Sequence, residues 1–388
     1  MISQKKILPF IVFSQFAGTS LWFAGNAILP QIQTAWRLPS NAVAQVTTAV
    51  MLGFILGTLA FALLSIADRF KASKVFMICS IFGALANISV VVLPGSFLVL
   101  LLARLVTGIC LAGIYPVGMK IASDWFSGQL GNALGFLVGA LVLGTAFPHL
   151  LNAYAADYNW QGVLIGTSGL ASLGGILMVL FVGDGPFRVE GASFDPKSAF
   201  GIFKKKDFRN AAFGYFGHMW ELYTFWAFVP FALTYYNEFQ RTAINTPLWS
   251  FFIIASGTLG CIVAGKISLK KGSAKVAVIF LMISGICCLL SPIIYEQAPW
   301  LFLALLIIWG FAVVGDSAQF STLNAQTCPQ ELKGTALTLA VSIGFLITIP
   351  SIQLMSYLIE HVTQEWALAS LVIGPIFGLS FSRKLIIR

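Results

Sequence analysis

The chain has 388 residues, of which 58% are apolar and 10% are charged, and its formal net charge is +9. Soluble domains average about 45–50% apolar and about 25% charged residues, and a chain of this length has no core large enough to bury the excess. The composition therefore excludes a soluble globular protein and predicts an integral membrane protein.

Twelve segments are long and apolar enough to span a bilayer, which takes about 20 mostly apolar residues per helix. Backbone polar groups in lipid must bond within their own segment, so we expect each segment to be a helix. The predicted fold class is all-α, with twelve transmembrane helices. In chain order the segments are 7–30, 43–67, 74–93, 96–120, 130–155, 160–182, 209–236, 247–268, 275–295, 299–325, 334–358 and 364–382.

The basic residues indicate how these helices are oriented. With the N-terminus in the cytoplasm, every lysine and arginine except Arg37, Arg104 and Arg241 falls on the cytoplasmic side. This bias follows the positive-inside rule and predicts that both termini and loop 184–208 are cytoplasmic. The positive net charge is thereby explained by membrane orientation, and we expect no nucleic-acid partner.

The polar stretch before the seventh segment divides the chain into two groups of six helices. It predicts an N-terminal six-helix half over 1–183, a cytoplasmic linker over 184–208 and a C-terminal six-helix half over 209–388. Such a duplicated unit is typical of transporters whose site lies between two pseudo-symmetric halves. The motifs that recur at nearly the same offset are Gly108-x4-Gly113 with Gly310-x4-Gly315, and Gly131-Asn-Ala-Leu134 with Gly334-Thr-Ala-Leu337.

Two further motifs carry a family resemblance. The loop after the second segment contains Asp68-Arg69-Phe-Lys71, and the fourth segment contains Arg104-Leu-Val-Thr-Gly108. Together with the twelve segments and the repeat, they resemble the major facilitator superfamily over essentially the whole chain. The loop keeps the Asp-Arg core of the family motif but lacks both of its glycines. Within the superfamily, the stretches "GHMWELYTFWAF" and "GDSAQFS" resemble a branch of poorly characterised bacterial permeases.

The resemblance implies a central cavity lined by helices one, four, seven and ten, and a multi-pass protein of the bacterial cytoplasmic (inner) membrane. It implies transport rather than catalysis, and the sequence has no Walker A loop, metal-spaced cluster or nucleophile motif. We therefore expect no enzyme activity, no cofactor and no metal. We expect a monomer whose partners are a small organic solute, protons and the lipid bilayer.

Five ionisable side chains lie at membrane depth, where an ionised group costs at least about 2.5–3.5 kcal/mol. Glu221 and Asp316 are the acids, Arg104 is the base that cannot easily reach the surface, and His218 is three residues from Glu221 and so on the same helix face. We expect Glu221, His218 and Asp316 to carry coupling protons. A purely structural role is the alternative for both acids and for Arg104, and we interpret His149 as a packed histidine.

The other polar and aromatic side chains on the four cavity helices predict the substrate site. Each tryptophan or tyrosine alone is more often a packing residue, so packing is the alternative for each. An aromatic-rich cavity with a base and several amides fits a medium-sized polar organic molecule. The candidate substrate-binding residues are Arg104, Trp22, Asn26, Tyr115, Trp220, Tyr223, Trp226, Gln319 and Asn324.

Three charged residues, Asp68, Arg69 and Lys71, lie at the predicted cytoplasmic rim. We interpret them as a latch between helices that stabilises one conformation, not as a substrate site. The six cysteines lie in or at the ends of predicted helices, and we interpret them as small packing residues.

The sequence thus predicts a secondary active transporter that moves a small organic solute by alternating access. Proton-coupled symport into the cell is the preferred mode, and proton-driven efflux by antiport is the alternative. The glycine-proline signature of the family's drug antiporters is not matched in the fifth segment, which offers Gly139-x4-Gly144-Thr-Ala-Phe-Pro148 instead. A non-transporting membrane sensor is the least favoured of the three functions.

Overall fold

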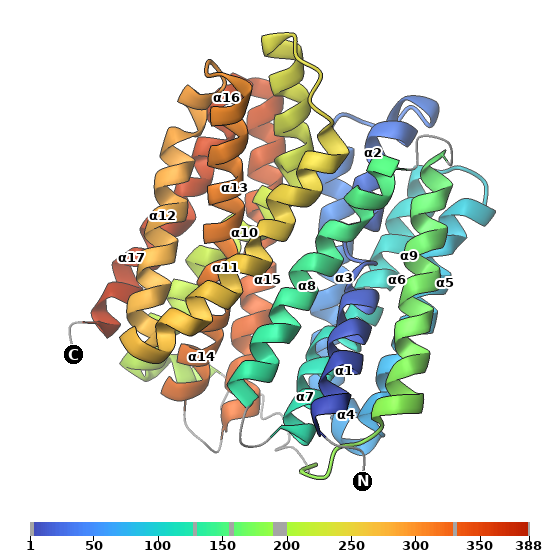
Figure 1. Cartoon of the computed structure of the whole chain (residues 1–388), viewed down its shortest axis with the longest axis vertical. Helices are drawn as coiled ribbons and strands as arrows, with labels where there is room; N and C mark the ends of the chain where they lie inside the picture. Colours follow the sequence, from blue (N-terminus) through green and yellow to red (C-terminus); the bar gives the residue numbers. More distant parts are fainter. Residues whose placement is uncertain (1–3, 127–129, 155–158, 189–199, 329–331, 387–388) are drawn as a thin grey trace. The chain divides into compact units, whose positions relative to one another are not determined.

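The protein forms two compact helical units, Met1–Gly191 (unit 1) and Ala192–Arg388 (unit 2) (Figure 1). Their boundary falls inside the polar stretch 184–208. The computed structural model describes residues 4–126, 130–154, 159–188, 200–328 and 332–386.

The described part of unit 1 is built from α-helices, and the last of them continues into a π-helical turn at Met178–Val182. In chain order the helices are α1 (Gln4–Thr19), α2 (Ala24–Ala35), α3 (Ala42–Leu63), α4 (Ile66–Arg69), α5 (Ala72–Val92), α6 (Phe97–Ala112), α7 (Tyr115–Trp125), α8 (Leu130–Tyr154) and α9 (Asn159–Leu177).

Unit 2 is built in the same way, with short 3-10 turns at Phe200–Lys204, Leu368–Val372 and Arg383–Leu385. Its helices are α10 (Lys206–Gln240), α11 (Thr246–Lys271), α12 (Ser273–Ile294), α13 (Pro299–Gly315), α14 (Ser317–Thr327), α15 (Lys333–His361), α16 (Gln364–Ala367) and α17 (Ile373–Ser382).

Eleven helical spans among the described residues are long and apolar enough to cross a bilayer. The remaining predicted segment, 209–236, forms α10, a helix of 35 residues. Its tyrosines and tryptophans, together with His218 and Glu221, make it less apolar than the other eleven. The predicted all-α membrane fold is therefore confirmed, and the span with the lowest hydropathy carries two of the three candidate coupling residues.

The predicted segments 43–67 and 364–382 leave the α-helix at residues 64–65 and at Leu368–Val372. Three others are each divided into two α-helices of eleven residues or more. The first breaks at residues 20–23, the fourth at Gly113–Ile114 and the tenth at Asp316. Gly113 lies in the second break and Gly315 ends the helix before the third, and a glycine at these positions weakens helix continuation. Before the first break, the hydroxyls of Thr19 and Ser20 donate to carbonyls of the preceding turn and compete with the helical ladder. At the first two breaks several backbone N–H groups bond to the carbonyl three residues back, and backbone groups left unbonded need other partners.

Both units contain the same glycine-based helix crossing. In unit 1, Gly53 of α3 faces α6, and a Cβ on Gly108 of α6 would lie 2.1 Å from the carbonyl oxygen of Val50. In unit 2, a Cβ on Gly310 of α13 would lie 2.1 Å from the carbonyl oxygen of Ile253 of α11. Small residues let membrane helices approach this closely. The repeated glycines of the sequence therefore make the same backbone contact in each unit.

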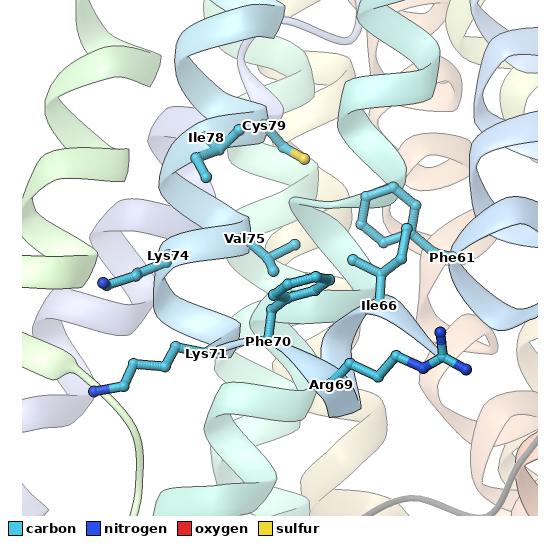
Figure 2. A pocket seen from close by; sticks show the side chains of 9 residues that line it. All are labelled: Phe61, Ile66, Arg69, Phe70, Lys71, Lys74, Val75, Ile78 and Cys79. Carbon is cyan, nitrogen blue, oxygen red and sulfur yellow. The ribbon is translucent and has the colours of Figure 1, made fainter. Parts of the chain in front are cut away.

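The connection from α3 to α5 turns sharply at Ser65, whose φ of 51° is left-handed. The four residues of α4 follow, and Lys71 precedes α5. Figure 2 shows Ile66 and Phe70 of this corner beside Val75 in the first turn of α5.

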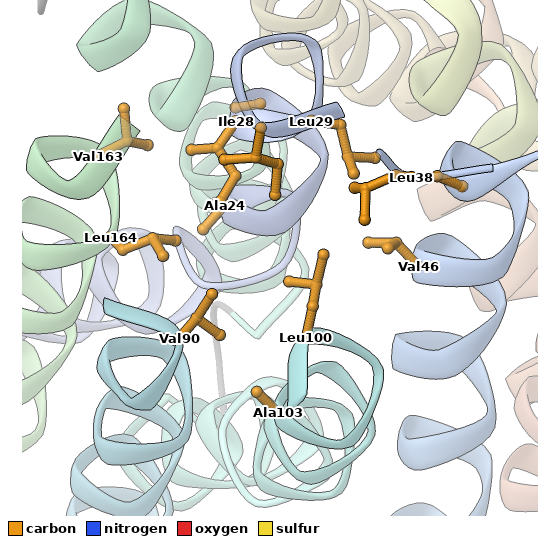
Figure 3. Packing of buried hydrophobic residues seen from close by; sticks show 13 residues of the cluster. Ala24, Ile28, Leu29, Leu38, Val46, Val90, Leu100, Ala103, Val163 and Leu164 are labelled. Carbon is orange, nitrogen blue, oxygen red and sulfur yellow. The ribbon is translucent and has the colours of Figure 1, made fainter. Parts of the chain in front are cut away.

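A hydrophobic cluster packs α2 against α3, α5, α6 and α9 (Figure 3). Its buried members include Ile28 and Leu29 of α2, Leu100 of α6 and Leu164 of α9. Burial of a side chain of this size contributes about 1.5–3 kcal/mol. The cluster therefore fixes the helix that follows the first break.

Candidate functional site

Three neutral donors surround the carboxyl group of Glu221 in unit 2, and its side chain is 0% exposed. The Trp309 indole N–H donates to Oε1 at 2.6 Å, the Ser284 hydroxyl to Oε2 at 2.9 Å, and the Cys288 thiol to Oε1 at 3.4 Å. Trp309 lies on α13, while Ser284 and Cys288 are one turn apart on α12. The carboxyl of α10 is thus enclosed by two neighbouring helices.

The Ser284 hydroxyl has two acceptors within reach. It lies 2.9 Å from Glu221 Oε2 and 3.1 Å from the carbonyl oxygen of Leu281, but it has only one proton to donate. When Glu221 is ionised, Ser284 can donate to it. When Oε2 is protonated, it can donate to Ser284, which then donates to Leu281. Both protonation states of Glu221 therefore have hydrogen-bond partners.

No cation pairs with Glu221 in the part of the chain that the structure describes. Neutral donors compensate a buried carboxylate only in part, and an unpaired buried charge is costly. The site is therefore better suited to a group that changes protonation state than to a permanent ion pair. Elsewhere among the described residues, ion pairs form between Lys120 and Asp68, between Arg188 and Asp184, and between His218 and Asp316.

The second acid, Asp316, lies against His218. Nδ1 of His218 and Oδ1 of Asp316 are 2.9 Å apart, and both side chains are fully buried. That distance suits an ion pair, although the angles are not those of a hydrogen bond, and Nε2 and Oδ2 have no hydrogen-bond partner. The sequence predicts that His218 works with Glu221, but residues three apart differ by about 60° around a helix. That offset lets His218 contact the break in the tenth segment, while Glu221 contacts α12 and α13.

The alternative that Asp316 caps a kink is not supported. The residue lies between the end of α13 and the start of α14, but its side chain makes no capping hydrogen bond. Its carboxylate turns to His218 instead.

Arg104 closes the break between α1 and α2. Its Nη2 donates to the carbonyl oxygen of Leu21 at 2.9 Å and to that of Trp22, both in the non-helical turn. A Cβ on Gly25 would lie 2.7 Å from Arg104 Cδ, so the glycine leaves room for the arginine. These contacts favour the alternative in which Arg104 supports the fold of the site.

Asn87 of α5 positions the guanidinium. Arg104 Nη1 donates to Asn87 Oδ1 at 3.3 Å, and Asn87 Nδ2 donates to the hydroxyls of Thr167 and Ser168 on α9 at 3.1 and 3.0 Å. Arg104 is 1% exposed and forms no ion pair with any described acid, and its Nε has no hydrogen-bond partner. Unit 1 therefore buries a positive charge that only neutral groups surround.

Three predicted substrate residues lie near Arg104 in unit 1. The fully buried ring of Trp22, whose carbonyl Arg104 binds, has its centroid 6.4 Å from that of Tyr115. Asn26, three residues after the break, donates to the Thr47 hydroxyl at 2.7 Å. The structure thus gathers these side chains around the first helix break.

The other predicted substrate residues belong to unit 2. The rings of Tyr223 and Trp226 meet edge to face with centroids 5.2 Å apart. Trp220 is half-buried, and its Nε1 has no hydrogen-bond partner. Gln319 and Asn324 are buried on α14, beside the third break. Their roles in binding stay predictions.

Of the three residues of the predicted latch, only the acid, Asp68, forms an ion pair with a described residue. Asp68 pairs with Lys120 of α7 at 2.8 Å, and Arg188 donates to the carbonyl oxygen of Asp68 at 2.9 Å. Arg69 and Lys71 are exposed and form no ion pair with a described residue. Asp68 thus joins α4 to α7 within unit 1.

His149 is buried, and its Nε2 has no hydrogen-bond partner. Within the described ranges, no group of three or more histidine, cysteine or acidic side chains could hold a metal ion.

Sequence reasoning missed Trp309, Ser284, Cys288 and Asn87. Cys288 is buried, as expected of a packing residue, and its thiol also donates to Glu221. Ser284 and Cys288 are four residues apart, which puts them on one helix face, but nothing in the sequence pairs that face with α10. Asn87 is the detectable residue, since it is an amide within an otherwise apolar segment.

Comparison of the sequence with known proteins shows which family the chain belongs to. A model described as the Major Facilitator Superfamily matches residues 11–352. A curated relative, the probable sulfoacetate transporter SauU of Cupriavidus necator, is 25% identical over 255 residues. The match spans 59% of this chain and 58% of the relative, so it covers little more than half the relative's length.

Solved structures share the fold. A bacterial homologue of the human lysosomal transporter Spinster, in an inward-facing and unoccupied conformation, superposes with a TM-score of 0.72 at 15% identity and covers 98% of both chains. Its inward-facing, occupied form also gives 0.72, at 14% identity, and covers 100% of this chain and 97% of its own. At these identities the likeness concerns the fold alone.

Proposed function

Because the chain belongs to the major facilitator superfamily, we propose that it takes up a small organic anion together with protons. Its family makes it a multi-pass membrane transporter of a small solute, not an enzyme. The proton coupling, the inward direction, the anionic substrate, the monomeric state and the cytoplasmic-membrane location with both termini inside belong to the proposal.

The observation that carries the proton coupling is the neutral surrounding of Glu221. Its donors are Trp309, Ser284 and Cys288, and no described cation pairs with it. A carboxylate beside a fixed cation would stay ionised, whereas this one can be neutral or ionised with its hydrogen bonds satisfied in each state. A group of this kind can take up a proton on one side of the membrane and release it on the other.

Alternating access supplies the two sides. In this fold, one half rocks against the other around a central site. A ligand shifts such an equilibrium only by binding one conformation better than the other. Protonation of Glu221 removes a buried charge, so it favours the conformation in which the carboxyl group is least exposed to water. His218 and Asp316 form a second proton-binding pair in the same unit.

The anionic substrate rests on two observations. The curated relative is named as a probable transporter of sulfoacetate, a small organic anion. Arg104 buries a positive charge that no described acid balances, and such a charge attracts anions strongly where the dielectric constant is low. Because its Nη2 holds the backbone at the first break, we assign Arg104 to the electrostatic field of the site and not to a direct substrate contact.

The test uses purified protein in liposomes, with sulfoacetate and simple carboxylates as probes and an imposed proton gradient. The wild-type protein should accumulate the substrate only with the gradient directed inward. Glu221→Gln keeps the size of the side chain but cannot ionise, so accumulation should vanish while exchange without net proton movement survives. Glu238→Gln, an exposed position on the same helix, is the matched control and should behave as the wild type.

Three outcomes would contradict parts of the proposal. Accumulation driven by an outward gradient would establish the efflux antiporter. Full accumulation in Glu221→Gln together with loss in Asp316→Asn would transfer the coupling to the second acid. Full accumulation in both variants would make Glu221 structural.

A further inference from the structure

A cavity of about 540 Å³ lies within unit 1, where the end of α3, the short helix α4 and the first turns of α5 meet (Figure 2). Cavities of about 300–1,000 Å³ are typical of sites for organic molecules. It contains none of the residues assigned above to proton coupling or to the substrate. The cavity therefore needs its own explanation.

Polarity changes along the cavity. Lys71 precedes α5 and Lys74 lies in its first turn, and Val75 and Ile78 follow one turn and two turns after Lys71. Figure 2 shows the lysines at one end and Ile78 at the other. Phe70 and Ile78 are 61% and 49% exposed, so apolar surface continues from the cavity to the outside of the unit. This gradient matches a molecule with a charged head and an apolar tail.

The charged end is purely cationic. Arg69, Lys71 and Lys74 line it, and none of them forms an ion pair with a described residue. The acid next in sequence, Asp68, is already engaged by Lys120 at 2.8 Å. Three basic residues thus line one cavity, Lys71 and Lys74 extending to one side of it and Arg69 to the other (Figure 2), and no described acid pairs with them.

We propose that this cavity binds an anionic phospholipid, with its phosphate on Lys71 and Lys74 and an acyl chain beside Val75 and Ile78, while Arg69 adds positive charge on the other side. Basic pockets at the ends of membrane helices attract anionic headgroups. A soluble phosphate would leave the apolar end unused, and a zwitterionic lipid would leave the cationic end uncompensated. The bound lipid braces α4 against α5, next to the contact that joins α4 to α7.

The test measures lipid binding to the full-length protein in detergent, by native mass spectrometry and by the shift in melting temperature. The probes are dioleoyl phosphatidylglycerol, dioleoyl phosphatidylcholine and glycerol phosphate. The variant Arg69→Gln/Lys71→Gln/Lys74→Gln removes the charges but keeps the side-chain length. It should weaken phosphatidylglycerol binding roughly tenfold to a hundredfold, while wild-type protein prefers phosphatidylglycerol over phosphatidylcholine.

The matched control removes three exposed lysines at the end of α11 in unit 2, as Lys266→Gln/Lys270→Gln/Lys271→Gln. It changes the net charge equally and should leave phosphatidylglycerol binding unaltered. Ile78→Trp, at an exposed position, fills the apolar end and should weaken binding even if the charge variant fails to fold.

Equal binding of both lipids by the wild type would overturn the proposal, as would unchanged phosphatidylglycerol binding in either cavity variant. Full competition by glycerol phosphate would identify a site for a soluble phosphate, and an equal loss in the α11 control would identify non-specific surface attraction. None of these measurements depends on the transport activity proposed above.

Discussion

Replacing Trp309 with phenylalanine removes one hydrogen bond from the proposed coupling residue and little else. The indole N–H donates to Glu221 Oε1 at 2.6 Å. The ring also stacks on Phe225, with centroids 4.6 Å apart, and a phenylalanine ring can keep that contact. The variant therefore isolates the donor from the packing.

The expected size of the effect follows from the charge on the acceptor. A hydrogen bond to a charged group contributes about 1.5–3 kcal/mol, and the indole donates more strongly to a carboxylate than to a neutral carboxyl group. One pH unit corresponds to about 1.36 kcal/mol of difference between two protonation states. Without the donor, ionisation becomes harder, so the pH at which proton-driven uptake is half-maximal should rise by about 1–2 units.

The assay is initial uptake into proteoliposomes over a series of pH values, with the proton gradient held constant. Trp300→Phe, at an exposed position at the start of the same helix, is the control and should keep the wild-type profile. An active Trp309→Phe protein whose midpoint is unchanged or lower would refute the assignment of Glu221 as the titrating group.

Three further outcomes test the scaffold. Asp68→Asn breaks the ion pair with Lys120 and should slow turnover with little change in the equilibrium affinity for substrate. A large loss of affinity would contradict the proposed role of Asp68 as a latch. Gly108→Ala forces a Cβ against the backbone of α3 and should cost about 1–3 kcal/mol of stability, seen as a lower melting temperature, whereas Gly135→Ala meets open space and should not. A cysteine at Ser193, outside the described residues, should be labelled only from the cytoplasm, and labelling from the periplasm would overturn the predicted topology.

Much of the fold could be predicted because the bilayer leaves few options. A long apolar segment in lipid has to be helical, so composition and length alone indicate the architecture. The cost of charge in lipid likewise identified Glu221, Asp316 and Arg104 as residues that need partners, and the structure gives each of them buried polar neighbours. The repeated glycines also mark an equivalent helix contact, since Gly108 and Gly310 make the same close backbone approach in the two units.

The partners themselves could not be predicted from local pattern. Trp309 is 88 residues from Glu221 in sequence, and a tryptophan in an apolar run predicts packing or an interface anchor. Ser284 looks like any small residue in a membrane helix. The break at residues 20–23 contains no proline or glycine, and it depends on Arg104, which bonds to its carbonyls from another helix. Such roles arise from tertiary contacts that periodicity does not encode.

The two units share one helix crossing but differ in their buried charges, and these two features serve different parts of the proposed mechanism. The glycine crossing is kept in both units, which preserves two similar rigid bundles. The charges predicted at membrane depth are not kept, because unit 1 contains Arg104 and unit 2 contains Glu221 and Asp316. An arginine paired with Glu221 in one unit would hold the carboxylate ionised, and the proton could no longer be exchanged. With the charges in separate units, a proton can neutralise Glu221 while the field of Arg104 attracts an anion. Coupling then requires only that one rocking motion changes the surroundings of both groups, since each ligand acts through its preference between conformations.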